Sequence, residues 1–138
     1  MLVRTPILIR GKPEYYHRLR AVTEKGAWED WILYKLEGIA ETASWTTDRI
    51  FAVRDLFNET LDRCRRELPR KVYSKELVEL VFTQPYCKIQ FLVDAGIAAR
   101  QTASEYLQEL ESIGVLSGER RGREIIYKHP ALLDVLTA

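Results

Sequence analysis

The chain has 138 residues, enough for one ordinary domain or two small ones. Hydrophobic residues make up 46% of it, which supports a packed core and excludes an intrinsically disordered chain. The 21 basic and 20 acidic residues nearly cancel, so the basic excess typical of a dedicated nucleic-acid binder is missing.

The cysteines and the apolar runs predict where the protein works. Cys64 and Cys87 are far apart and have no metal-ligand spacing, which is typical of reduced, intracellular cysteines. No apolar run approaches the roughly 20 residues of a membrane helix. The apolar stretch over residues 2–9 is short and interrupted by Arg4 and Pro6, unlike a signal peptide. We therefore expect a cytoplasmic protein with no membrane partner.

The front half predicts three helices. The first spans residues 14–23. The second spans residues 28–43, where apolar residues recur at steps of three and four, and Ser44 to Asp48 would form a cap region. A third, long helix would follow and run to Leu68, before Pro69. The apolar stripe of the second helix comprises Trp28, Trp31, Ile32, Leu36, Ile39, Ala40 and Ala43.

The back half, residues 71–138, predicts three short helices and a hairpin. Ser74 would cap the first helix, and Gly96 would end the second. The third would run from about Arg100 to Ile113, followed by two strands around a glycine-containing loop and a short terminal helix. This order is the winged helix-turn-helix pattern. The sequence thus predicts a mainly α fold: a three-helix front subdomain over residues 1–70, then a winged helix with a small two-stranded β wing.

A winged helix makes double-stranded DNA a candidate partner. The third helix would read bases and the wing would contact phosphates. Carboxylates on the same surfaces, such as Glu105 and Glu119, would repel phosphates, and many winged helices dock proteins instead. Both hypotheses therefore stay open. The candidate DNA-binding residues are Arg100, Gln101, Thr102, Ser104, Arg120, Arg121 and Arg123.

Aromatic residues of the front helices predict a protein interface. A stripe at helical spacing is more typical of a core or an interface than of a ligand site. Trp28, Trp31 and Trp45 would pack in one cluster. The candidate interface residues are Tyr15, Tyr16, Trp28, Trp31 and Trp45, and the partner would be another protein or a second copy of the chain.

No set of residues predicts catalysis or a bound cofactor. We expect both histidines, His17 and His129, to be partly exposed structural residues, because neither has a partner at metal-ligand spacing. No glycine-rich phosphate loop or nucleophile elbow is present in the sequence. The sequence therefore indicates no catalytic residue, no metal and no cofactor.

Several segments together resemble the C-terminal part of Fic-family proteins, enzymes that transfer AMP onto hydroxyl side chains of other proteins. In the front half these are Pro6-Ile7-Leu8, Glu14-Tyr15-Tyr16, Trp28-Glu29-Asp30-Trp31-Ile32 and Leu36-Glu37-Gly38-Ile39-Ala40-Glu41-Thr42-Ala43. In the back half they are Leu92-Val93-Asp94-Ala95-Gly96-Ile97-Ala98, Arg100-Gln101-Thr102-Ala103-Ser104-Glu105-Tyr106-Leu107 and Leu110-Glu111-Ser112-Ile113-Gly114-Val115-Leu116.

The resemblance implies an accessory role for this chain. In the family, the front segments form the last helices after the catalytic core, and the back segments form a winged-helix tail. The catalytic loop, His-Pro-Phe-x-Asp/Glu-Gly-Asn-Gly-Arg, has no counterpart, because the one His-Pro pair, His129-Pro130, continues as Ala131-Leu132. No catalytic residue can be transferred. We expect a non-enzymatic region that serves dimerisation, target recruitment or regulation, with a DNA-binding regulator module as the alternative.

Overall fold

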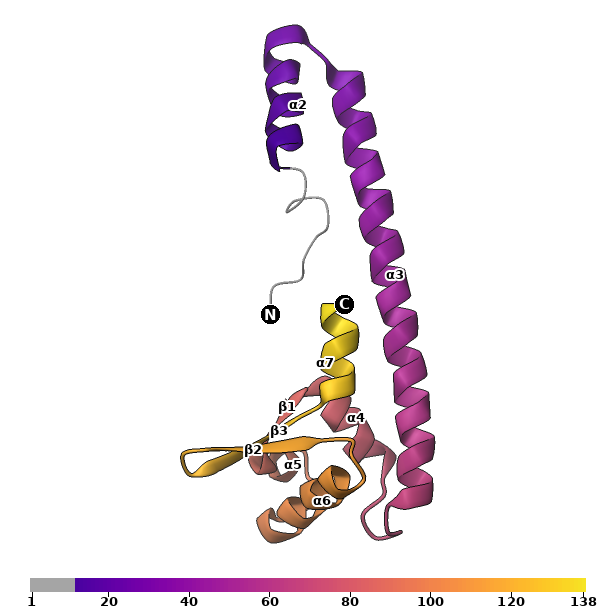
Figure 1. The fold of residues 1–138 in the computed structure, drawn as a ribbon, viewed down its shortest axis with the longest axis vertical. Coiled ribbons are helices and arrows are strands. Elements are labelled where there is room, and N and C mark those ends of the chain that lie inside the picture. Colours follow the sequence, from indigo (N-terminus) through magenta and orange to yellow (C-terminus); the bar gives the residue numbers. More distant parts are fainter. Residues whose placement is uncertain (1–11) are drawn as a thin grey trace. The chain divides into compact units, whose positions relative to one another are not determined.

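The computed structural model describes residues 12–138, and it contains six helices and a three-stranded antiparallel sheet in that range (Figure 1). The apolar stretch predicted over residues 2–9 lies outside the described part. Two compact units, Met1–Ile50 and Phe51–Ala138, are described separately below as unit 1 and unit 2. Within residues 12–138, no helix combines the length and apolar character needed to cross a bilayer.

Unit 1 consists of helix α2, Lys12–Lys25, and the first part of helix α3, Trp28–Glu67. Gly26 makes the turn between them with a φ of 64°, a backbone conformation that glycine adopts without strain. The Tyr15 ring meets the Trp31 ring edge to face at 5.3 Å, and this contact joins the two helices. Neither α2 nor the part of α3 in unit 1 contains a fully buried residue. This pair of helices therefore has no core of its own.

The break predicted between residues 44 and 48 is wrong. α3 runs without interruption for 40 residues, so the described front half has two helices rather than three. Ser44, Thr46 and Asp48 are common cap residues, but they only compete with a helix and do not end one, as proline does. The Thr47 hydroxyl instead donates to the Ala43 carbonyl within the helix at 2.7 Å.

The predicted tryptophan cluster is also wrong. Trp31 packs against Tyr15 and Tyr34, while Trp45 lies against the Arg49 guanidinium at 5.0 Å. Trp28 is 61% exposed. Trp45 lies 14 residues after Trp31, or about 21 Å along the helix at 1.5 Å per residue, which is too far for the two rings to meet. The aromatic cluster is built from tyrosines of α2 instead.

Unit 2 contains the helices and the hairpin that the sequence predicts. Ser74 caps the first helix, since its hydroxyl accepts a hydrogen bond from the Leu77 backbone N–H at 3.1 Å. Gly96 has a φ of 71° just after the second helix, as expected of a C-terminal cap. The elements are α4 Lys75–Thr83, β1 Tyr86–Cys87, α5 Ile89–Asp94, α6 Arg100–Ser112, β2 Ser117–Arg121, β3 Glu124–Lys128 and α7 Pro130–Thr137.

The sheet has three strands rather than the two predicted. Its order is β1-β3-β2, and β3 pairs antiparallel with both neighbours. β1 has two residues, too few to show the alternation by which a strand is recognised in sequence. Figure 1 shows the β2–β3 hairpin extending beyond helices α5 and α6. Helices followed by a hairpin in a small sheet are compatible with the winged-helix arrangement.

The core of the described chain lies in unit 2. On α6, Ala103, Leu107 and Leu110 are fully buried, as the helical spacing predicts. Buried residues of α3, α4, β1, α5 and β3 complete the core: Cys64, Leu77, Val78, Val81, Cys87, Leu92 and Tyr127. The domain boundary predicted at residue 70, shortly after α3 ends, stays a prediction.

The predicted partial exposure of His129 is wrong, because the residue is 1% exposed. Its Nδ1 accepts a hydrogen bond from the Leu132 backbone N–H at 3.2 Å and thereby caps α7. Its ring packs edge to face on Phe82 at 4.7 Å. The His129 backbone N–H donates to the Pro85 carbonyl at 2.9 Å, so this residue joins the end of β3, the start of β1 and α7.

Candidate functional site

Helix α6 presents a polar face that carries most of the predicted base-reading residues. The apolar side of α6 is buried. Arg100 and Gln101, at its N-terminal end, lie on the other side and are exposed. The Arg100 guanidinium donates to the Gln90 side chain at 3.3 Å. Thr102 and Ser104 are half-buried, and the Ser104 hydroxyl accepts a hydrogen bond from the Gln108 side chain at 3.4 Å. Arg100 and Gln101 are therefore better placed than Thr102 and Ser104 to meet a ligand.

The three predicted wing arginines, Arg120, Arg121 and Arg123, are exposed on the β2–β3 hairpin. Gly122 at the tip has a φ of 64° and closes the turn between the strands. An ion pair links Arg121 to Glu119 at 3.7 Å. No ion pair in residues 12–138 engages Arg120 or Arg123. The hairpin thus holds two cations that are not neutralised by a neighbouring carboxylate.

Two acidic residues of the wing are paired with lysines. Glu119 lies 2.7 Å from the Lys128 ammonium, and the hydrogen bond from Lys128 is the main cause that lowers the pKa of Glu119. Lys88, which precedes α5, pairs with Glu124 at 3.1 Å. These ion pairs reduce the repulsion that the two carboxylates would exert on a phosphate.

Two grooves flank α6, and both contain carboxylates. One, of about 540 Å³, lies between α6 and the hairpin and is lined by Glu111, Arg120 and Tyr127 among others. Glu111 accepts a hydrogen bond from the Gly118 backbone N–H at 2.8 Å. Burial and then the Glu111 charge raise the pKa of Tyr127. The other groove, of about 600 Å³, includes Glu105 and Glu109. The middle and end of α6 are therefore acidic, while its start and the hairpin tip are basic.

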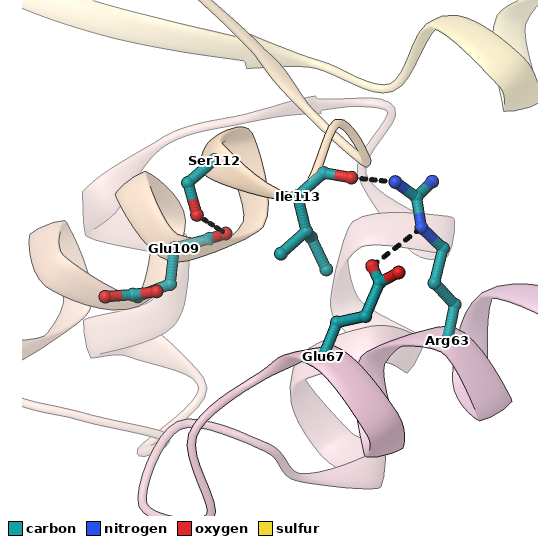
Figure 2. Close-up of polar contacts among 5 residues, drawn as sticks. All are labelled: Arg63, Glu67, Glu109, Ser112 and Ile113. Carbon is teal, nitrogen blue, oxygen red and sulfur yellow. Dashed lines mark hydrogen bonds and ion pairs between the residues drawn. The ribbon is translucent and has the colours of Figure 1, made fainter.

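A side chain of α3 holds the C-terminal end of α6 (Figure 2). The Arg63 guanidinium donates to the Ile113 carbonyl and, through Nε, to the Glu67 carboxylate at 2.9 Å. The Ser112 hydroxyl donates to the Glu109 carbonyl at 2.7 Å, which completes the end of the helix. Sequence reasoning missed Arg63, because a contact between residues 50 positions apart leaves no local pattern.

Only two of the five predicted interface residues of the front helices are exposed in the structure. Tyr16 and Trp28 are exposed, whereas Tyr15, Trp31 and Trp45 are half-buried. Larger apolar exposure lies on α3 at residues that the interface prediction did not name and that make no ring contact with α2. Ile32, Leu33, Leu36, Ile39 and Ile50 are each more than half exposed there. A contiguous exposed apolar surface of this kind is typical of a protein-interaction site.

The C-terminal half of the chain matches a known domain. Residues 56–132, more than half of the chain, match the family model described as the C-terminal domain of SoFic-like protein adenylyltransferases. The chain belongs to this family. The resemblance to the C-terminal region of Fic-family proteins is thereby confirmed.

The SoFic-like match covers most of unit 2. It begins within α3, includes α4 to α6 and the three strands, and ends within α7. It therefore contains α6, the hairpin and Arg63, but not the exposed apolar surface of unit 1.

Two cysteines and one histidine of this SoFic-like domain could in principle act as a nucleophile or a base, and all three are buried. Burial raises the pKa of Cys64 and of Cys87 to about 11, so both thiols stay protonated at neutral pH. Burial lowers the pKa of His129, whose Nδ1 is already occupied by the cap of α7. None of these three groups is suited to attack or deprotonate a substrate.

Proposed function

We propose that this chain is a non-catalytic accessory region of a SoFic-like protein adenylyltransferase, which docks a protein through the exposed apolar surface of α3. The single observation that carries the proposal is the contrast along that helix. Cys64 and Thr60, near its C-terminal end, are buried. Leu36 and Ile39, on the same face, are 55% and 65% exposed. An exposed apolar face on a helix is typical of a surface that a partner covers.

The chemistry of the buried groups supports the non-catalytic part of the proposal. The two thiols remain protonated, and the buried histidine serves as a helix cap. The free, buried cysteines also support the cytoplasmic location that forms part of the proposal.

An adenylylation assay tests this part. Incubation of the chain with ATP, magnesium and a protein acceptor is expected to leave the acceptor unlabelled, because the sequence has no counterpart of the family's catalytic loop. A complete SoFic-like adenylyltransferase serves as the positive control. Labelling above the level of a sample without the chain would contradict the proposal.

DNA binding is the second candidate, and the charge arrangement of the hairpin favours it. Arg120 and Arg123 form no ion pair in the described range, and the wing carboxylates are paired with lysines. Few cations are available, so few counterions would be released. Binding would be weak, in the range of about 10⁻⁴ to 10⁻⁶ M that is typical of non-specific complexes.

Replacing Arg120, Arg121 and Arg123 together by alanine should weaken binding to all duplexes alike and reduce its salt dependence. Replacing Gln101 by alanine should instead alter sequence preference. Fluorescence anisotropy with labelled duplexes at several salt concentrations measures both effects. The matched control replaces the exposed cations Arg20, Arg66 and Arg70, which removes the same charge elsewhere. Equal loss in both triple variants, or no binding at low salt, would remove the wing as a DNA contact.

A further inference from the structure

We propose that a second copy of this chain covers the exposed surface of α3, so that two α3 helices pair antiparallel across it. This inference rests on the proposed function, since it names the partner that docks there. Three observations carry it: the spacing of the apolar residues, the distribution of charge around the helix, and the coverage that each unit already provides.

The spacing is that of helices that pair with one another. One face of α3 repeats at alternating steps of three and four residues from Ile32 to Cys64. Such a heptad repeat keeps one seam in contact with a facing helix over many turns. We call these residues the α3 seam. They are Ile32, Leu36, Ile39, Ala43, Thr46, Ile50, Val53, Phe57, Thr60 and Cys64.

The C-terminal end of the seam already packs against the core of unit 2 within the same chain. In unit 2, Thr60 and Cys64 are the two buried residues of α3, and Phe57 packs on the core and meets Phe82 at 5.2 Å. The open part of the seam continues this packed face at the same spacing. It runs from Ile32 to Ile50, or about 28 Å at 1.5 Å per residue.

Helix α2 leaves the open part uncovered. Its contacts are made with another face of α3, through Tyr15 on Trp31 and Arg18 over the Tyr34 ring at 5.0 Å. Neither Trp31 nor Tyr34 belongs to the seam. The first half of α3 therefore has two apolar faces, and α2 covers only the one that contains Trp31 and Tyr34.

The seam itself carries no charge. The open seam and the residues on one side of it, Leu33, Ala40 and Thr47, carry no charge, whereas the other side carries Lys35 and Arg49. Both of these cations lie over aromatic rings: the Lys35 ammonium is 4.8 Å from the Tyr15 ring centre, and the Arg49 guanidinium is 5.0 Å from that of Trp45. Two copies thus meet without like charges in the seam itself.

Antiparallel pairing uses the open part alone. In a parallel pair, Phe57 and Thr60 of one copy would face the same residues of the other, although unit 2 already packs against them. Reversed about residue 41, Ile32 faces Ile50, Leu36 faces Thr46 and Ile39 faces Ala43. Larger side chains then meet smaller ones in two of these three layers, which allows close packing.

Sedimentation equilibrium tests the proposal. The 16.1 kDa chain is expected to approach twice its monomer mass as its concentration rises. Replacing Leu36 and Ile39 by lysine should weaken association by at least about tenfold, because charges would be buried in the seam. Both side chains are more than half exposed in the monomer, so the variant should keep its circular dichroism spectrum. The control, Ser44→Lys with Asn58→Lys, adds the same charge at exposed positions outside the seam and should dimerise normally.

A disulfide tests the antiparallel geometry. Ala40→Cys places the new thiol beside the two-fold axis, where it meets its own copy, and oxidation should give a covalent dimer. Cys64 and Cys87 are fully buried and contribute little background. Glu37→Cys, on the charged side of the helix, should not crosslink. A dimer that fails to crosslink through residue 40 would overturn the antiparallel pairing.

A monomer at every concentration would overturn self-pairing. The catalytic segment of a SoFic-like adenylyltransferase, added as a separate polypeptide, then distinguishes the two proposals. Binding that is lost in the Leu36→Lys, Ile39→Lys variant would leave the proposed docking function in place with a different partner. No binding in either experiment would overturn both.

Discussion

Replacing Leu107 by alanine is expected to lower the free energy of unfolding of unit 2 by about 3 kcal/mol, near the middle of the range for buried leucines. Leu107 is 0% exposed at the centre of α6, between Ala103 and Leu110. Its truncation removes apolar contacts and leaves a cavity that the rigid α6 cannot close. Because α6 carries the candidate DNA-reading residues, the same substitution should impair any ligand binding by that helix.

Denaturant titration can separate this effect from unit 1. The three tryptophans lie in residues 12–50, so tryptophan fluorescence reports on unit 1, while far-ultraviolet circular dichroism reports on all helices. The dichroism transition should move to lower urea concentration in Leu107→Ala. Gln108→Ala, at the exposed neighbouring position, should change stability by less than about 0.5 kcal/mol. Equal effects of the two substitutions would contradict the packing of α6 described above.

Replacing His129 by alanine is expected to cost a similar amount, about 3 kcal/mol, from two sources. Loss of the cap at the Leu132 N–H costs about 1 kcal/mol. Loss of the buried ring, which packs on Phe82, adds a cavity cost. His17→Ala provides the matched control, since that histidine is exposed and should change stability by no more than about 0.5 kcal/mol.

The same histidine should make stability depend on pH. Burial lowers the pKa of His129, so the unfolded chain takes up a proton at a higher pH than the folded chain does. Stability from this residue is complete above the ordinary histidine pKa of about 6.5 and falls as the pH decreases toward the folded pKa. Protonation would also remove the lone pair with which Nδ1 caps α7. The loss of stability below about pH 6.5 should be smaller in His129→Ala, and an unchanged profile would contradict this assignment.

Local sequence signals were sufficient for most elements of unit 2. Ser74 and Gly96 mark helix ends through backbone hydrogen bonding and through a φ that glycine adopts, and both are local effects. The spacing of Ala103, Leu107 and Leu110 specifies the buried face of α6 in the same way. The continuity of α3 was missed because weak cap residues do not break a helix when the flanking turns continue it.

The candidate sites were only partly predictable. The wing arginines and the start of α6 were recognised from their types and positions in the winged-helix pattern, and the structure places them on exposed surfaces. The exposed part of the α3 seam was not separated from the half-buried Tyr15 and Trp31, because apolar spacing does not tell which face α2 covers.

The amino-acid sequence by itself determined the mainly helical class, the helix–hairpin order of the back half and the resemblance to Fic-family proteins, because these depend on local periodicity, turn residues and short motifs. Only the tertiary structure decided that β1 joins the sheet, that Arg63 holds the end of α6 and that His129 is buried as a cap. The β1 pairing and the Arg63 contact join residues far apart in the sequence, which local periodicity does not relate. The burial of His129 depends on elements that are distant in the sequence. Such contacts arise because leaving a buried polar group without a hydrogen bond costs free energy, so the folded chain pairs most of the polar groups that it encloses.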